Sequence, residues 1–505
     1  MKRFSWLLLA ALAVSPAVAD DKKKDDKKAK EAPVVAQAPA AQDAVKDAEA
    51  KISAGDSDGA VDVLKKAMAT DPLAALRLGR LREARGELDL SVDDYKVAAE
   101  KLTGPARGEA LGRMSVAQTA RGMAGAAASA EAAIAADPEG AWPTIAMSYL
   151  RAHEGKADDA VALAQKAMEK GGGAAALAAL AHSQEAKGDA AAAEASYRKA
   201  IADDPTAIGP VVGLATVLRK TGRAAEAEPL LKKVIDSAPG AVDAYKEMAR
   251  VKITLGRAQE ALADANLAAA MAENDPDAQA LVIEAKVGRA LQDLAGGQTD
   301  LAVQDLTKLR DENPGSAAVR LGLGRTQIAR RDPDAALPEL QKAVELEPGN
   351  AEAQYQLGYV YHVMKQNAAS AVGPFGKAVE AEPGNTLFRT SLGSALMDAG
   401  QLDRAVEELT KVTGSEGYSG WQAWFYLGAA QLKASRYKEA AAALEKAVAG
   451  KPDNAQAEAF LAWSYFGLKD ADSFKAHGAT ARKLGYKDPQ LFERLTKVEA
   501  GQPIK

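Results

Sequence analysis

The apolar and helix-breaking positions along this chain recur with a period of about 34 residues. Stretches of helical, amphipathic periodicity alternate with short breaks, and a proline recurs after each amphipathic stretch. Two intervals between these prolines are 34 residues, and the 380 residues from Pro72 to Pro452 correspond to eleven repeats of about 34.5. The prolines after the better-defined stretches are Pro205, Pro239, Pro276, Pro314, Pro348, Pro383 and Pro452. The pattern predicts a long series of antiparallel helix pairs.

Small residues recur at fixed distances before the prolines. Gly324, Ala336 and Ala343 precede Pro348 at the distances at which three alanines precede Pro205. Two antiparallel helices approach closely only where side chains are small, and large apolar residues must fill the space beside them. The expected fillers include Leu323, Leu340, Leu427 and Leu444.

This pattern resembles the tetratricopeptide-repeat family over about 440 of the 505 residues. The resemblance implies an all-α fold, a right-handed superhelical solenoid of about thirteen helix-turn-helix motifs, over residues 41–487. It also implies that helix A of each repeat lines a concave groove in which peptides or partner helices lie. The repeats start near residues 41, 72, 107, 141, 174, 208, 242, 283, 317, 351, 386, 421 and 455.

Three features depart from the regular repeat. The interval from Pro276 to Pro314 exceeds one repeat by about one helical turn, which predicts a long first helix from Asp277 to Ala295. A run of three glycines, 171–173, replaces the expected proline turn and predicts a weak joint. Each of these two irregularities is either a hinge or a harmless change in turn length. In the last segment, 488–505, Asp488 and Pro489 predict a capping helix whose apolar stripe covers the end of the array.

The first 40 residues have the pattern of a targeting segment followed by a linker. Lys2 and Arg3, the apolar run 4–14 and Ala17-Val18-Ala19 predict a signal peptide over residues 1–19, with Asp20 as the mature N-terminus. An uncleaved anchor is the alternative, but about eleven apolar residues fall short of the roughly 20 that span a bilayer. Residues 20–40 predict a disordered charged and Ala/Pro-rich linker, or a contact with peptidoglycan or a membrane surface.

Composition and charge narrow the classes of function. The chain is 48% apolar and carries a formal net charge of −5, which becomes −7 when Lys2 and Arg3 are removed. A mildly acidic chain lacks the basic patch that nucleic acid or anionic lipid requires, so we expect no nucleic-acid partner and no membrane insertion after signal cleavage. There is no cysteine, which excludes disulfides, thiolate metal sites and thiol catalysis.

No catalytic or cofactor motif emerges. The four histidines lack metal-ligand spacing, and phosphate-loop and dinucleotide patterns are missing. Ser196, Lys199 and the Lys220-Thr221-Gly222 triplet match the elements of penicillin-binding acyltransferases, but the triplet falls in an expected turn between two helices. We therefore expect no enzyme activity, no metal and no cofactor.

Aromatic residues concentrate toward the C-terminus, where 18 of 25 lie between Tyr355 and Phe492. Some fill the large-residue positions of the repeat, including Tyr361, Phe375, Trp424 and Tyr465. Others share one side of helix A, and we take them as candidate partner-binding residues of the groove because aromatics bury large area at low entropic cost. The alternative is tighter packing between adjacent helices. The candidates are Tyr355, Tyr359, Phe425, Tyr426, Phe460, Trp463 and Phe466.

Two functional hypotheses follow. The first is a non-catalytic scaffold or adaptor that binds proteins or peptides in a periplasmic, multiprotein envelope assembly, and any outer-membrane association would run through those partners. Exported arrays of this style are similar to components of gliding-motility, secretion and polysaccharide-export machines. The second is an accessory that binds a polysaccharide or recruits an enzyme in polysaccharide or cell-wall processing, because Tyr and Trp faces also stack on sugars.

Overall fold

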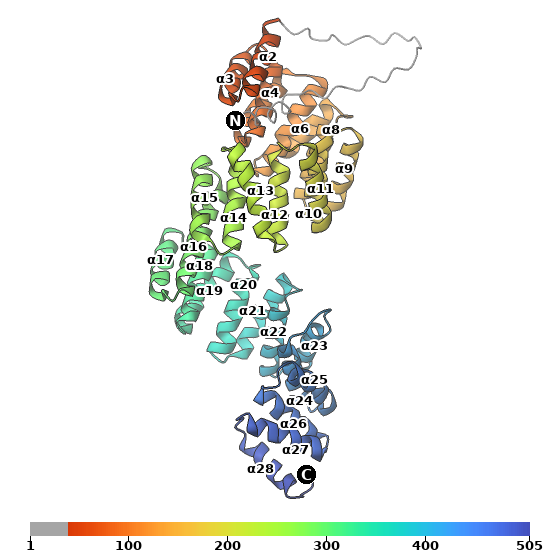
Figure 1. Cartoon of the computed structure of the whole chain (residues 1–505), viewed down its shortest axis with the longest axis vertical. Helices are drawn as coiled ribbons and strands as arrows, with labels where there is room; N and C mark the ends of the chain where they lie inside the picture. Colours follow the sequence, from red (N-terminus) through yellow and green to blue (C-terminus); the bar gives the residue numbers. More distant parts are fainter. Residues whose placement is uncertain (1–38, 505) are drawn as a thin grey trace, which may run out of the picture. The chain divides into compact units, whose positions relative to one another are not determined.

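The computed structural model describes residues 39–504, with side chains from Ala44 onward. The predicted signal peptide and nearly all of the predicted linker lie outside the described residues. Every regular element within that range is helical, and no strand occurs there, so the all-α fold is confirmed (Figure 1). The chain divides into two compact units, the first ending at Arg289 and the second beginning at Ala290.

In the first unit the helices form seven successive antiparallel pairs. They are α2 (Pro39–Ser53), α3 (Ser57–Ala67), α4 (Pro72–Ala84), α5 (Leu88–Lys101), α6 (Gly104–Ala120), α7 (Ala126–Ala136), α8 (Ala141–His153), α9 (Ala157–Glu169), α10 (Gly173–Lys187), α11 (Ala190–Asp203), α12 (Ile208–Lys220), α13 (Ala224–Ser237), α14 (Val242–Thr254) and α15 (Ala258–Met271). Helix α16 (Pro276–Ala295) contains the boundary between the units.

The second unit continues the same arrangement and ends in a single helix. Its elements are α17 (Thr299–Glu312), α18 (Ala317–Ala329), α19 (Pro333–Leu346), α20 (Ala351–Tyr359) with the π-helical turn η1 (Val360–Met364), α21 (Ala368–Ala381), α22 (Thr386–Asp398), α23 (Leu402–Thr413), α24 (Trp421–Lys433), α25 (Tyr437–Gly450), α26 (Ala455–Gly467), α27 (Ala471–Lys483) and α28 (Pro489–Glu499).

The repeat boundaries predicted from the sequence agree with the helices. Nine of the thirteen predicted starts coincide with the first residue of a helix A, namely 72, 141, 208, 242, 317, 351, 386, 421 and 455. The expected long helix is confirmed, because α16 has 20 residues. It begins at Pro276, which explains why a start placed at 283 was too late. The capping helix is also confirmed, since the Asp488 carboxylate accepts the backbone N–H of Leu491 and α28 buries its apolar stripe.

Helix caps and turn glycines explain where the elements begin and end. The side chain of Asn350 accepts the N–H of Ala353 at 3.0 Å, and Asn454 caps α26 in the same way. Between helices A and B the chain needs one residue with positive φ, which is usually glycine, as at Gly400 (φ 77°). In four repeats of the second unit this position is held by Arg331, Gln366, Ser435 and Lys469.

Close packing of helices A and B depends on a glycine opposite a leucine. A Cβ placed on Gly428 would lie 2.5 Å from Leu444 Cγ, and Gly324 stands in the same relation to Leu340. Both leucines are fully buried. The small residue therefore lets the two helix axes approach until the leucine fills the interface, as the sequence pattern predicts.

The π-helical turn η1 accommodates one extra residue. Relative to the start of helix A, helix B begins one position later in the repeat that starts at Ala351 than in the repeats that start at Ala317 and Thr386. A π-turn inserts a residue into a helix without breaking it. The insertion lies directly after Tyr359, so it sets the direction of the side chains that follow this tyrosine.

Candidate functional site

All seven candidate aromatics lie on helix A of three repeats in the second unit. Tyr355 and Tyr359 are on α20, Phe425 and Tyr426 on α24, and the other three on α26. Helices α22, α24 and α26 contact one another in series. Tyr355 of α20 stacks on Phe388 of α22, which extends this series to α20, so the candidates belong to one run of adjacent helices.

Tyr355 and Tyr359 pack against the core that α20, α21 and α22 share. The ring of Tyr355 stacks on Phe388 with centroids 4.9 Å apart, and its centroid lies 5.6 Å from that of Phe375. Burial raises the pKa of the Tyr355 hydroxyl above its ordinary value. Both tyrosines remain half-buried, so each has one face on the core and part of its surface open.

Phe425 is the one candidate that is buried, with 7% of its surface exposed. Its ring stacks on Phe460 at 5.6 Å with an interplanar angle of 11°, and meets the edge of Tyr426 at 5.3 Å. The expectation that Phe425 presents its ring to a partner is corrected accordingly. The neighbouring helix α26 covers Phe425, whose ring contacts the half-buried rings of Tyr426 and Phe460.

Trp463 and Phe466 join the last repeat to the capping helix. The indole Nε1–H of Trp463 donates to Asp488 Oδ2 at 3.0 Å. The guanidinium of Arg494 lies 4.7 Å from the ring centre of Phe466 and 5.8 Å from that of Trp463. Both rings are half-buried against the terminal core, which includes Phe474. Both rings thus pack mainly on α28 and the terminal core, and part of each ring stays exposed at the end of the array.

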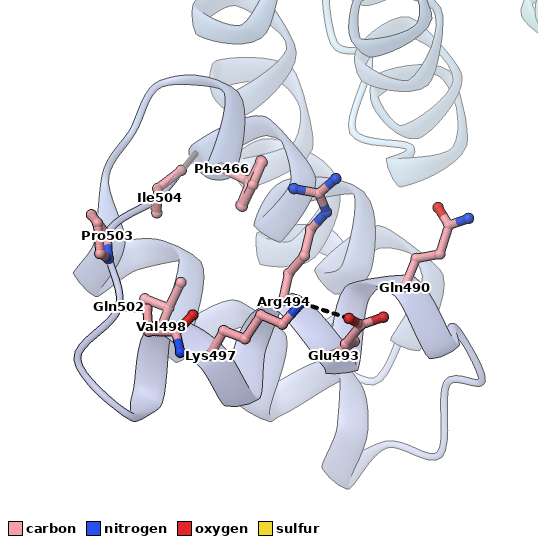
Figure 2. Close-up of a pocket in the computed structure, with 9 residues that line it drawn as sticks. All are labelled: Phe466, Gln490, Glu493, Arg494, Lys497, Val498, Gln502, Pro503 and Ile504. Atoms are coloured by element: carbon pink, nitrogen blue, oxygen red, sulfur yellow. Dashed lines mark hydrogen bonds and ion pairs between the residues drawn. The ribbon is translucent and has the colours of Figure 1, made fainter.

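A cavity of about 490 Å³ adjoins this end (Figure 2). Phe466 forms part of its wall, Glu493, Arg494 and Lys497 of α28 contribute charged groups, and Pro503 and Ile504 close the side opposite Arg494. Lys497 Nζ donates to Glu493 Oε1 at 2.6 Å. The cavity is open and mixed in charge, and it extends the candidate aromatic surface beyond α26.

A polar triad that sequence reasoning missed crosses three consecutive repeats at the C-terminal ends of their A helices. Asp398 at the end of α22 contacts His362 Nε2 at 3.1 Å through one oxygen and accepts from Lys433 Nζ at 3.1 Å through the other. The three residues are 36 and 35 positions apart, close to one repeat length. That spacing is the signal which could have revealed the triad, since it places the groups at one level of adjacent A helices.

The acyltransferase-like residues do not form a reactive group. Ser196 is buried within α11, and the Lys220 ammonium donates to Glu185 Oε1 at 2.8 Å. Gly222 has φ 80° and lies in the turn between α12 and α13, where the repeat places its glycine. Within residues 39–504, no three His, Asp or Glu side chains gather where a metal ion could bind. No helix in that range has the length and apolar character needed to cross a bilayer.

Comparison with protein families finds tetratricopeptide-repeat models in both units. One matches residues 185–234 and 218–282, and the other matches residues 321–386 and 390–472. A comparison with curated proteins finds no match. The matched ranges coincide with the regular repeats around α11–α15 and α18–α27.

Several solved structures are similar to parts of the chain. YrrB, a tetratricopeptide-repeat protein with an unusual peptide-binding site, is 23% identical over 38% of this chain and 97% of its own, with a TM-score of 0.34. The Cut9–Hcn1 hetero-tetramer of the APC/C is 12% identical over 91% and 96%, with a TM-score of 0.41. PilW, a type IV pilus biogenesis factor, is 16% identical over 42% and 98%, with a TM-score of 0.37. Because all three TM-scores are below 0.5, we attribute none of these proteins' partners to this chain.

Proposed function

Because this chain belongs to the tetratricopeptide-repeat family, we propose that it is a non-catalytic scaffold that binds protein partners through the A helices of its second unit. The observation that carries the proposal is a series of partly exposed aromatic rings on α20, α24 and α26, called here the aromatic surface. It consists of Tyr355, Tyr359, Tyr426, Phe460, Trp463 and Phe466.

The aromatic surface has the chemistry of a protein-binding site. Each ring is held by the core on one side, so a partner orders few additional side chains when it binds. The triad of His362, Asp398 and Lys433 supplies polar groups at the C-terminal ends of the A helices, which suit the polar rim of an interface. An apolar centre with a charged border fits a peptide or helix that carries aliphatic side chains.

We propose further that the protein acts in the bacterial envelope, in a periplasmic assembly. This step rests on the sequence of residues 1–19, which has the basic, apolar and small-residue segments of a signal peptide. Motility, secretion and polysaccharide export are the candidate processes. N-terminal sequencing of the envelope form tests the step: a chain that begins at Asp20 supports export, and an intact Met1 on a membrane-bound product contradicts it.

The polysaccharide-binding alternative uses the same rings. The two hypotheses differ in the molecule that contacts the aromatic surface in the cell, a protein or a polysaccharide. A photoreactive phenylalanine derivative at Tyr359 keeps an aromatic ring in place and captures molecules within a few ångströms. The matched control is the same substitution at Lys377, which is exposed on helix B of the same repeat.

A protein scaffold should give discrete protein adducts from position 359 in intact cells and none from position 377. Mass spectrometry of the adducts would then identify the partner. Loss of the 359 adducts on adding excess envelope polysaccharide, with carbohydrate found on the captured peptide, would favour the alternative. Equal adduct patterns at both positions would contradict a binding role for the aromatic surface.

A further inference from the structure

In the first unit, repeats that are not neighbours in the sequence contact one another. The backbone turn between α4 and α5 packs on the segment that precedes α14, five repeats further along. A Cβ on Gly86 would lie 2.4 Å from Ala241 Cα, and one on Gly240 would lie 3.2 Å from the carbonyl oxygen of Arg85. In a simple array each repeat touches only its neighbours, so this contact couples distant parts of the unit.

Arg121 forms the charged part of the same contact. It follows α6, and its Nη1 donates to Asp243 Oδ1 on α14 at 2.5 Å. Its Nε lies 3.2 Å from Asp89 Oδ1 on α5, and Asp275 is 3.9 Å from Nη1. The Arg121 side chain is 6% exposed. The guanidinium is therefore enclosed by carboxylates from three separate repeats.

Lys246 extends the network along α14. Its Nζ lies 2.9 Å from a carboxylate oxygen of Asp275, 2.9 Å from one of Asp277 and 3.5 Å from one of Asp243. Removing one member of a mostly buried charge network leaves the others without compensation, which is more costly than losing an exposed pair. The network thus holds the two distant edges of the first unit together.

We propose that Arg121 and the turn at Gly86 form a latch that holds the first unit in a closed superhelical turn, a conformational device separate from the aromatic surface. The latch comprises Gly86, Asp89, Arg121, Ala241, Asp243 and Asp275. With the latch open, the two repeats formed by α4–α7 lose their link to α14 and to the start of α16. The unit then extends through small rotations at each repeat interface. The closed form depends on charges that are largely shielded from solvent, so removing one of them opens the latch.

The test measures a distance across the latch in the full chain. Because the sequence contains no cysteine, Lys96→Cys on α5 and Asn266→Cys on α15 introduce two unique spin labels, both at exposed positions. Pulsed electron resonance then gives the distribution of label separations. The latched protein should give one narrow distribution at low salt.

Two variants open the latch by different means, and each has a matched control. Gly86→Ala adds a methyl group against Ala241, whereas Gly222→Ala adds one at a turn with φ 80° and nothing within 4 Å. Both alanines carry the same backbone strain, so only the inter-repeat contact differs. Arg121→Met removes the latch cation, and Arg198→Met removes a cation that pairs with Glu194 one turn away on α11.

Gly86→Ala and Arg121→Met should each lengthen and broaden the distribution, while both controls leave it unchanged. Combining Arg121→Met with Asp243→Asn should add nothing to either change alone. Circular dichroism checks that each variant stays helical. An unchanged distribution in Arg121→Met or in Gly86→Ala overturns the proposal.

Discussion

The Trp463 indole and the Asp488 carboxylate connect the last repeat to the helix that ends the array. One carboxylate oxygen accepts the indole N–H at 3.0 Å, and the other accepts the backbone N–H of Leu491 at 3.0 Å. A single side chain therefore caps α28 and fixes its position against α26. Because its indole bonds the residue that caps α28, Trp463 is a structural residue as well as a member of the aromatic surface.

Trp463→Ala should lower the stability of the C-terminal repeat. The substitution removes a half-buried ring and a charge-assisted hydrogen bond, and truncation of a large aromatic costs about 3–5 kcal/mol when fully buried. We expect a loss of about 2–3 kcal/mol, visible as a lower first transition in a thermal melt. Trp463→Phe keeps most of the packing and should lose about 1 kcal/mol. Equal melts for Trp463→Ala and the parent would contradict this structural role.

Tyr359→Ala and Phe375→Ala should have opposite consequences. Tyr359 is half-buried, so its truncation should cost little stability but weaken partner binding by about 2 kcal/mol, roughly 30-fold in Kd. Phe375 is fully buried, so its truncation should cost about 3–5 kcal/mol of folding stability. The measurements are a melt and a titration with the partner captured at position 359. If Tyr359→Ala binds normally, the aromatic surface is packing alone.

Two glycine-to-alanine substitutions separate close packing from backbone entropy. Gly428→Ala places a methyl group 2.5 Å from Leu444 Cγ and 3.2 Å from the carbonyl oxygen of Ala440, so overpacking should cost about 1–3 kcal/mol. Gly376 lies inside α21 with nothing within 4 Å of its Cβ position, and no proline follows it. Gly376→Ala should therefore stabilise the protein by about 0.5–1 kcal/mol. Chemical denaturation of both variants measures the difference, which should have opposite signs.

Asp94 should make the first unit less stable as pH rises through the mildly acidic range. Burial raises the pKa of its carboxyl to about 6, although Arg82 Nη1 lies 2.8 Å away and acts in the opposite direction. The folded state then binds a proton that the unfolded state releases near pH 4, so stability falls between about pH 4 and pH 6. At about 1.4 kcal/mol for each pH unit between the two pKa values, the upper limit is about 3 kcal/mol.

The control for this prediction is Asp94→Asn, which keeps the shape and removes the titration. Other carboxylates titrate in both proteins, so the informative quantity is the stability of the parent minus that of the variant. That difference should decrease from pH 4 to pH 7. A difference that is constant with pH would mean that the pKa of Asp94 is not raised.

Local stability should differ along the chain. Helices α7 and α9 bury mainly alanine, for example Ala130 and Ala164, whereas α23 buries Leu409 and Val412. Burial of apolar area contributes about 25 cal/mol per Å², and an alanine side chain has little area to bury, so these helices gain little stability from it. Because repeats stabilise chiefly their neighbours, amide exchange should be faster before Pro205 than after Asn350. Uniform protection would contradict this, and slow exchange confined to the latch would indicate coupling across the first unit.

The sequence by itself determined the repeat register and the special helices. Proline and small-residue spacing placed nine helix starts, because every repeat solves the same backbone packing problem with the same residue types. The additional turn of chain before Pro314 determined the long α16, and Asp488-Pro489 determined the capping helix. These features depend on local capping, turn geometry and periodicity, which a single sequence displays directly.

Only the tertiary structure decided how those helices meet. Nothing in the local sequence distinguishes Arg121 from arginines that stay exposed. Its link to Asp243 arises because small rotations summed over several repeats bring distant edges together. The same holds for Phe425, whose burial depends on the angle at which α26 covers it, and for the Trp463–Asp488 bond. Repeat angles result from many side-chain contacts acting together, so periodicity specifies the helices and packing specifies their arrangement.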